Sequence, residues 1–234
     1  MNWEGGRTFN RNKIEGWVKN AFAEGMNPSL KVTSVVSRDK KQGRPTPLNT
    51  VNLLKACSKA LGIGPHAAMQ TAERLYLSGY LSYPRTESTA YPKSFDIEGT
   101  LRQQQTDPRW GQYVQQLLQS GPNKGKSGVD MGDHPPITPC RAANPAELHG
   151  DMSRIYELVV RHFIATVSSD AVWRSTKITF RCEALGDKGG FSVSGKEMKS
   201  PGFLAVLMHK EYGDNELDEY MKDKEEEELE QKLP

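Results

Sequence analysis

The stretch "NTVNLLKACSKALGIGPHAAMQTAERLYLSGYLSY" (Asn49–Tyr83) predicts two helices followed by an extended segment. The pair Asn49–Thr50 supplies good N-caps, and Gly62 ends the first helix. Pro65 lies in the first turn of the second helix, and Gly79 follows its end. The apolar positions with mostly helical spacing are Val51, Leu54, Ala56, Cys57, Ala60 and Leu61 in the first helix, and Ala68, Met69, Ala72, Leu75 and Tyr76 in the second.

The connection between these helices is a short "GIG" turn, so the pair forms a helix-turn-helix. After Gly79 the sequence changes to "YLSY", which is typical of an extended chain. Two helices followed by an extended segment are the outline of a winged-helix unit, a fold often used on nucleic acid. The outline of a fold does not by itself establish a function.

β-like stretches lie on both sides of this helical region. "VTSVVS" (Val32–Ser37) predicts a strand, and "RDKKQGRPTP" (Arg38–Pro47) predicts a basic linker. The linker is either a solvated connector or a loop that follows a nucleic-acid strand, with Arg44 as a contact. "STKITFRCEAL" (Ser175–Leu185) and "GGFSVSGKEM" (Gly189–Met198) predict two strands joined by a glycine-rich turn.

Two further helices are expected. They are "WGQYVQQLLQ" (Trp110–Gln119) and "DMSRIYELVVRHFIATVSS" (Asp151–Ser169). Between them, "GDHPPITP" (Gly132–Pro139) must be extended, because each residue before a proline is pushed out of the helical region. Residues 1–30 show no clear pattern.

Charge is distributed unevenly along the 234 residues. The tail from Glu211 to Pro234 contains eleven acidic and three basic residues, so its charge is −8. Because the net charge of the whole chain is +2, the rest of the chain carries +10. The tail is expected to be disordered or loosely helical. A basic body suits a polyanion such as nucleic acid, although charge spread over all faces for solubility fits equally well. Three distant cysteines favour a reducing compartment, and no apolar run reaches the ~20 residues of a membrane span.

The segment "SYPRTE" (Ser82–Glu87) combines residues that suit attack on a phosphate. Pro84 favours an extended Tyr83, so Tyr83 and Arg85 can face the same side. A phenol is a poor nucleophile at neutral pH because its pKa is about 10, but a guanidinium can stabilise the phenolate and grip a phosphate. Ser82 and Thr86 could donate hydrogen bonds to phosphate oxygens, and Glu87 could orient Arg85. Taken alone, such a loop is more often a packed turn.

A resemblance to a known family favours a catalytic role for this segment over a packed turn. "LYLSGYLSYPRTESTAYP" closely resembles the active-site segment of type IA DNA topoisomerases, especially the topoisomerase III group, in which a tyrosine is followed after one residue by Arg-Thr and an acidic residue. "RPTPLNTVNLLKACS" and "AMQTAERLY" resemble the helices before it. "GDHPPITP" resembles the histidine motif and "RIYELVVRHFIATVSSDA" the return helix, both most like the beta branch. "WEGGRTFNR" (Trp3–Arg11) looks like a strand of the family's β-rich arch. The resemblance covers residues 3 to 205.

The resemblance implies a reaction. Tyr83 would attack a phosphodiester of one strand, form a 5′-phosphotyrosine bond and release a 3′-hydroxyl, which reseals the strand after another strand has passed. Arg85 would stabilise the pentavalent phosphate. His134 would lie near the phosphate and add charge or move a proton, whereas chemistry alone favours a structural histidine held by Pro135 and Pro136. No ATP is required, because the ester keeps the bond energy.

Type IA enzymes hold Mg²⁺ through clustered carboxylates in a Toprim domain, and nothing upstream of Tyr83 matches that domain. The chain is therefore expected to begin midway through the enzyme, to lack the metal site and to relax DNA poorly or not at all by itself. The resemblance further implies single-stranded DNA or RNA as substrate, a Tudor-domain scaffold protein as partner and the nucleus, with the cytoplasm as a second location.

The expected fold class is α+β, an incomplete type IA topoisomerase core in which a helical, winged-helix-like tyrosine domain is carried on part of a β-rich arch. Residues 1–38 would be the first arch strands, 39–167 the helical domain, 168–210 the returning strands and 211–234 the acidic tail. Two alternatives remain: a non-catalytic module that binds single-stranded nucleic acid or regulates such an enzyme, and an incomplete product with no function of its own.

Overall fold

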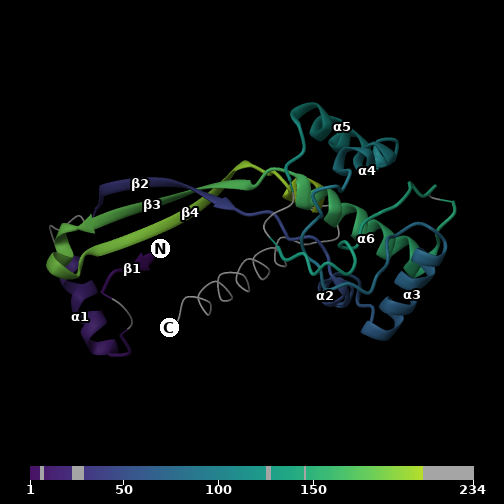
Figure 1. The fold of residues 1–234 in the computed structure, drawn as a ribbon. Coiled ribbons are helices and arrows are strands. Elements are labelled where there is room, and N and C mark those ends of the chain that lie inside the picture. The colour runs from purple at the N-terminus through teal and green to yellow at the C-terminus, as the bar shows by residue number, and fades with distance from the viewer. Residues whose placement is uncertain (6–7, 23–28, 125–127, 145, 208–234) are drawn as a thin grey trace. The chain divides into compact units, whose positions relative to one another are not determined.

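The structure is a computed structural model that describes residues 1–5, 8–22, 29–124, 128–144 and 146–207 (Figure 1). Contacts divide the chain into two compact units. The sheet unit comprises Met1–Gln42 and Ala171–Ser200, and the helical unit comprises Gly43–Asp170 with the residues from Pro201 onward. The chain therefore passes from the sheet unit to the helical unit at Gly43, returns to the sheet unit at Ala171 and enters the helical unit again at Pro201. The acidic tail predicted from residue 211 lies outside the described residues.

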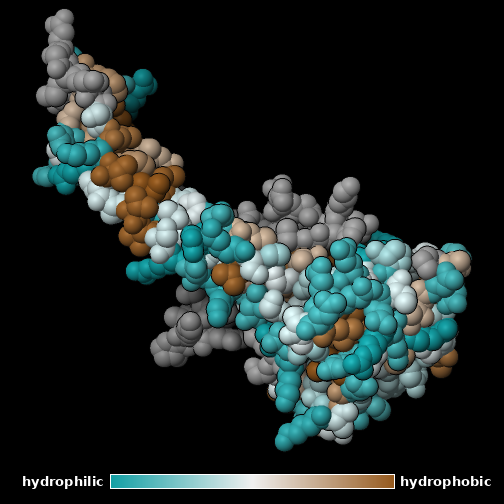
Figure 2. All heavy atoms as spheres, turned by 90° about the horizontal axis from the view of Figure 1, so that it is seen from above, coloured by the Kyte–Doolittle hydropathy of each residue, from teal (hydrophilic) through white to brown (hydrophobic). Residues whose placement is uncertain are grey.

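The sheet unit is built on four antiparallel strands in the order β1-β4-β3-β2. Their bounds are Asn2–Trp3 (β1), Leu30–Gln42 (β2), Ala171–Cys182 (β3) and Gly190–Ser200 (β4). The predicted turn between the last two is a 3₁₀ segment, η1, at Glu183–Lys188. Hydrophobic side chains gather on the face of this unit seen in Figure 2, and Val32 and Val35 of β2 are both more than half exposed.

Two predictions for the sheet unit are wrong. The basic residues from Arg38 to Gln42 continue β2 instead of forming a linker, because they pair with β3 from Ser175 back to Ala171. Of the described residues in the stretch Trp3–Arg11, only Trp3 lies in a strand, since β1 ends there. The chain then forms helix α1 (Arg11–Ala21), whose first turn is capped by the Asn10 side chain accepting a hydrogen bond from the backbone N–H of Lys13.

The helical unit contains α2 (Thr50–Leu61), α3 (Pro65–Leu77), α4 (Ile97–Gln104), α5 (Gly111–Ser120), α6 (Gly150–Val167) and α7 (Leu204–Leu207). The predicted bounds of α2 are confirmed: the Asn49 side chain accepts from the backbone N–H of Asn52, and Gly62 has a φ of 66°. Cys57 is buried on the inner face of α2 as expected, but Leu53, which the predicted apolar positions omit, is also buried, whereas Val51 is 56% exposed.

Helix α6 is the centre of the helical unit, packing against α2, α3 and α7. Its buried residues include Ile155, Val159 and Phe163. Residues 201–207 group with this unit and not with the returning strands, because α7 packs on α6 and the Arg161 guanidinium donates to the carbonyl of Val206 at 2.9 Å. Among the described residues, no helix has both the length and the apolar character needed to cross a membrane.

Candidate active site around Tyr83

The Tyr83 loop begins where α3 ends. Gly79 has a φ of 74°, a left-handed conformation that favours glycine, and it turns the chain away from the helix axis. The backbone N–H of Gly79 donates to the carbonyl of Tyr76, and that of Tyr80 to the carbonyl of Leu75. The loop therefore folds back along α3, and this reversal places Tyr83 beside the last turns of that helix.

The histidine segment runs alongside the Tyr83 loop. Leu81 and Pro139 form an antiparallel bridge, and the backbone N–H of Ser82 donates to the carbonyl of Thr138 at 2.9 Å. The Ser82 hydroxyl accepts a hydrogen bond from the backbone N–H of Thr138. The same hydroxyl donates a hydrogen bond to the carbonyl of Pro136 at 3.2 Å. The segment is extended from Pro135 to Pro139 as predicted, whereas Gly132–His134 form a bend in which Gly132 has a φ of 74°. This arrangement places His134 next to Tyr83.

The first turn of α2 holds the other end of the loop through Thr50. The backbone N–H of Thr50 donates to the carbonyl of Thr86 at 3.0 Å, and the N–H of Thr86 donates back to the Thr50 hydroxyl at 2.9 Å. The same hydroxyl lies 2.8 Å from the carbonyl of Pro84. Tyr83 and Arg85 thus alternate with Pro84 and Thr86, which are hydrogen-bonded to Thr50. The start of α2 therefore fixes the backbone positions of Tyr83 and Arg85.

The Tyr83 ring lies between two other rings. Its centroid is 4.7 Å from that of His134 and 5.3 Å from that of Tyr76, both with edge-to-face geometry. Such pairs stabilise a defined ring orientation. Tyr83 itself is half-buried. The structure therefore brings together the predicted nucleophile and the predicted histidine.

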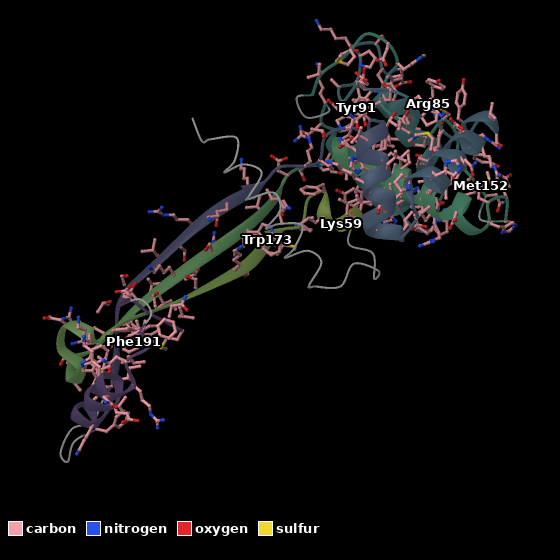
Figure 3. All side chains as sticks on the ribbon, turned by 90° about the horizontal axis from the view of Figure 1, so that it is seen from below. Lys59, Arg85, Tyr91, Met152, Trp173 and Phe191 are labelled. Atoms are coloured by element: carbon pink, nitrogen blue, oxygen red, sulfur yellow. The ribbon has the colours of Figure 1, made fainter. Side chains whose placement is uncertain are left out.

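Arg85 is paired with a carboxylate that the sequence did not indicate. Its Nε and Nη2 both donate to Oε1 of Glu73, at 2.8 Å and 2.6 Å, so Glu73 of α3 and not Glu87 orients the guanidinium. The pair is open to solvent, with 60% of the Arg85 side chain exposed, and Figure 3 labels Arg85 on the helical unit. Glu73 and Tyr76 are three residues apart on α3, so both face the returning loop.

The three residues predicted to bind nucleic acid all have partners inside the protein. The Thr86 hydroxyl, which is buried, donates to the carbonyl of His134, and the Ser82 hydroxyl is used as described above. The Arg44 guanidinium donates to Asp170 at 3.0 Å and to the carbonyl of Lys124 at 3.1 Å. Their binding of nucleic acid stays a prediction, and in this structure each of the three side chains has a structural contact.

A second carboxylate, Asp133, lies next to the histidine. The backbone N–H of His134 and the hydroxyl of Ser88 hold the pKa of Asp133 below its usual value. Asp133 is therefore an anion at neutral pH, and it fixes the loop that carries His134. No group of three His, Cys, Asp or Glu side chains suited to a metal ion occurs within the part of the chain that the structure describes.

Comparisons with known proteins identify the family to which this chain belongs. Residues 1–233 match the protein family described as DNA topoisomerase. The chain is 45% identical to human DNA topoisomerase 3-beta-1 over 207 residues, which are 88% of this chain and 23% of that protein. It is 44% identical to DNA topoisomerase 3-beta of Arabidopsis thaliana over 222 residues, covering 95% of this chain and 25% of the relative. The chain thus spans about a quarter of the length of these curated relatives.

The fold is shared with a solved structure of full-length topoisomerase I from Thermotoga maritima. The TM-score is 0.63, and the match covers 89% of this chain and 33% of that one at 17% sequence identity. This similarity supports the predicted mixture of helices and antiparallel sheet as part of a type IA core. The family match over nearly the whole chain, together with the topoisomerase 3-beta relatives, shows that this chain belongs to the DNA topoisomerase family.

Proposed function

We propose that this chain is the strand-cutting segment of a type IA topoisomerase and that Tyr83 is its nucleophile. The observation that carries the proposal is the position of the Tyr83 ring beside His134 in a loop fixed at both ends, with Arg85 two residues further on. The substrate is single-stranded nucleic acid. DNA is the substrate that the relatives' names indicate, and RNA offers the same phosphodiester.

In the first step, the oxygen of Tyr83 bonds to a backbone phosphorus and the bond from phosphorus to the 3′-oxygen breaks. The phenol proton leaves, and the 3′-oxygen takes up a proton to become a hydroxyl. The reverse attack by this hydroxyl releases Tyr83 and reseals the strand, so no net bond energy is lost. Tyrosine is a known covalent nucleophile when its environment activates it.

Arg85 and His134 supply the charge that this step needs. A guanidinium near the phosphate stabilises the negative charge that develops on the phosphate oxygens. Arg85 can do so once it exchanges its contact with Glu73 for a contact with the phosphate. His134 can donate or accept a proton at the phosphate. The Mg²⁺ requirement, the nuclear location and the Tudor-domain partner rest on the resemblance alone.

A chimera tests the proposal. Residues 1–207 of this chain replace the matching segment of human DNA topoisomerase 3-beta-1, and relaxation of supercoiled DNA is measured. We expect the chimera to relax DNA and to form a covalent adduct with an oligonucleotide. Tyr83→Phe should abolish both, whereas the neighbouring Tyr76→Phe should keep both.

Two results would contradict the proposal: an active Tyr83→Phe chimera, or an adduct on another tyrosine. The chain alone should turn over poorly, because no carboxylate cluster for a metal is found among its described residues. Should Tyr83 prove dispensable in the chimera, the alternative of a non-catalytic nucleic-acid-binding module would be favoured.

A further inference from the structure

Strand pairing sorts the side chains of the sheet unit onto two faces. Successive side chains in a strand point to opposite faces, and residues directly opposite in the ladder share a face. Arg38 of β2 and Lys196 of β4 both lie opposite Ser175 of β3, so these three share one face. Asp39, Arg174 and Glu197 lie opposite one another on the other face.

The face that contains Asp39 carries apolar side chains together with charges of both signs. Arg174 donates to both carboxylate oxygens of Asp39, at 2.8 Å and 3.1 Å, and Lys199 lies 2.9 Å from Glu197. Val35 of β2 and Val193 of β4, both exposed, flank Ile178 on this face. It carries every carboxylate of the described strands β2, β3 and β4.

On the opposite face, here called the basic face, every charged residue of β2, β3 and β4 is positive, and the carboxylate of Glu4 lies beside Gly190 at the end that contains Arg181. Its six basic residues are all exposed: Lys31, Arg38 and Lys40 of β2, Lys177 and Arg181 of β3, and Lys196 of β4. Among the described residues, only Arg181 of this set forms an ion pair, at 3.7 Å from Asp187 of η1. Like charges repel and normally spread over a surface, so their collection on one face favours a polyanionic ligand.

An aromatic side chain lies within the same face. Trp173 is half-buried and lies opposite Lys40 on one side and Met198 on the other. Its indole N–H donates to the Gln42 side chain at 3.2 Å, which fixes the ring. Figure 3 labels Trp173 on the sheet unit. Basic residues that follow a phosphate backbone, with an aromatic ring for base stacking, are the usual elements of single-strand binding surfaces.

We propose that the basic face binds the phosphate backbone of a single-stranded nucleic acid, as a non-covalent site separate from Tyr83. Side chains two residues apart on one strand, such as Arg38 and Lys40, are about 7 Å apart. An extended single strand repeats its phosphates at a comparable spacing, so it can lie along β2 and β3. This proposal does not depend on the chemistry of Tyr83.

The test compares equal losses of charge on the two faces of the intact chain. Lys177→Gln/Lys196→Gln removes two lysines from the basic face. Lys41→Gln/Lys199→Gln, the matched control, removes two from the opposite face. Binding of a fluorescently labelled oligothymidine is followed by anisotropy over a range of salt concentrations, and circular dichroism checks that both variants are folded.

The basic-face variant should bind more weakly and depend less on salt. Each phosphate contact contributes about 0.7 to the slope of log K against log salt for a single strand, so two lost contacts lower the slope by about 1.4 and the affinity by about 25-fold at about 0.1 M salt. The control variant should match the unchanged chain. Equal losses in both variants, or a loss in neither, would overturn the proposal.

Two further measurements distinguish the basic face from the Tyr83 site and nucleic acid from an acidic protein. The adduct experiment at Tyr83 and the binding experiment with Lys177→Gln/Lys196→Gln change different residues, so a failed adduct experiment would count against the proposed function and not against the basic face. Polyglutamate serves as an acidic-protein competitor. If it binds the basic face as tightly as the oligonucleotide, with the same sensitivity to Lys177→Gln/Lys196→Gln, the assignment to nucleic acid is wrong.

Discussion

Replacing Glu73 with glutamine should strengthen the binding of single-stranded DNA. Arg85 donates two hydrogen bonds to one oxygen of Glu73, and a phosphate must compete with that carboxylate for the guanidinium. The two side chains are 60% and 37% exposed, and pairs of this kind are worth about 0.2 to 1 kcal/mol. If Glu73→Gln removes this competition, the affinity should rise by at most about fivefold, because about 1.4 kcal/mol corresponds to a factor of ten.

Fluorescence anisotropy with a labelled oligonucleotide at low salt measures this effect in the intact chain. Glu98→Gln is the matched control: Glu98 forms a comparably exposed ion pair with Arg102 on α4, and its loss should leave the affinity unchanged. Arg85→Gln should remove the benefit of Glu73→Gln in the double variant. Weaker binding by Glu73→Gln would refute the reasoning, because it would mean that Glu73 holds Arg85 ready for the phosphate and does not compete with it.

Two other predictions concern stability. Thr50→Ala removes the hydroxyl that joins α2 to the Tyr83 loop and should lower the free energy of unfolding by about 1 to 3 kcal/mol in urea titrations, whereas Thr50→Ser should restore most of it. Burial raises the pKa of Tyr156 to about 12 and also raises that of Tyr91. These phenols ionise near pH 10 in the unfolded chain, so the free energy of unfolding should be unaffected below pH 10 and should fall as the pH rises toward 12. The expected loss is up to about 1.4 kcal/mol per pH unit for each group. Urea midpoints measured across this pH range test the prediction, and a constant midpoint would contradict it.

Local signals in the sequence were sufficient to place α2 and the end of α3. Asn49 caps α2 through its side chain, and Gly62 ends α2 through its left-handed backbone conformation. Both effects involve only residues that are near in sequence, and both were expected. The extended form of the histidine segment likewise follows from its prolines, which act on the residue before them. These features need no knowledge of the tertiary structure.

Other features depend on contacts between distant parts of the chain. Residues Arg38–Gln42 belong to an edge strand exposed on both faces, so they show no apolar alternation that would distinguish them from a linker. Helix α4, which was not predicted, contains a glycine and few apolar residues. The pairing of Arg85 with Glu73 follows from the reversal at Gly79, and spacing along the sequence does not reveal it.

Strand β2 forms one edge of the sheet, and its outer row of backbone N–H and C=O groups is open to pairing with another polypeptide. An antiparallel meeting of two copies centred on Asp39 would place Arg38 of each strand opposite Lys40 of the other, and the two Asp39 side chains opposite one another. The resulting repulsion disfavours lateral growth of the sheet from copy to copy. The charged residues along β2 therefore also protect an exposed thirteen-residue strand against aggregation.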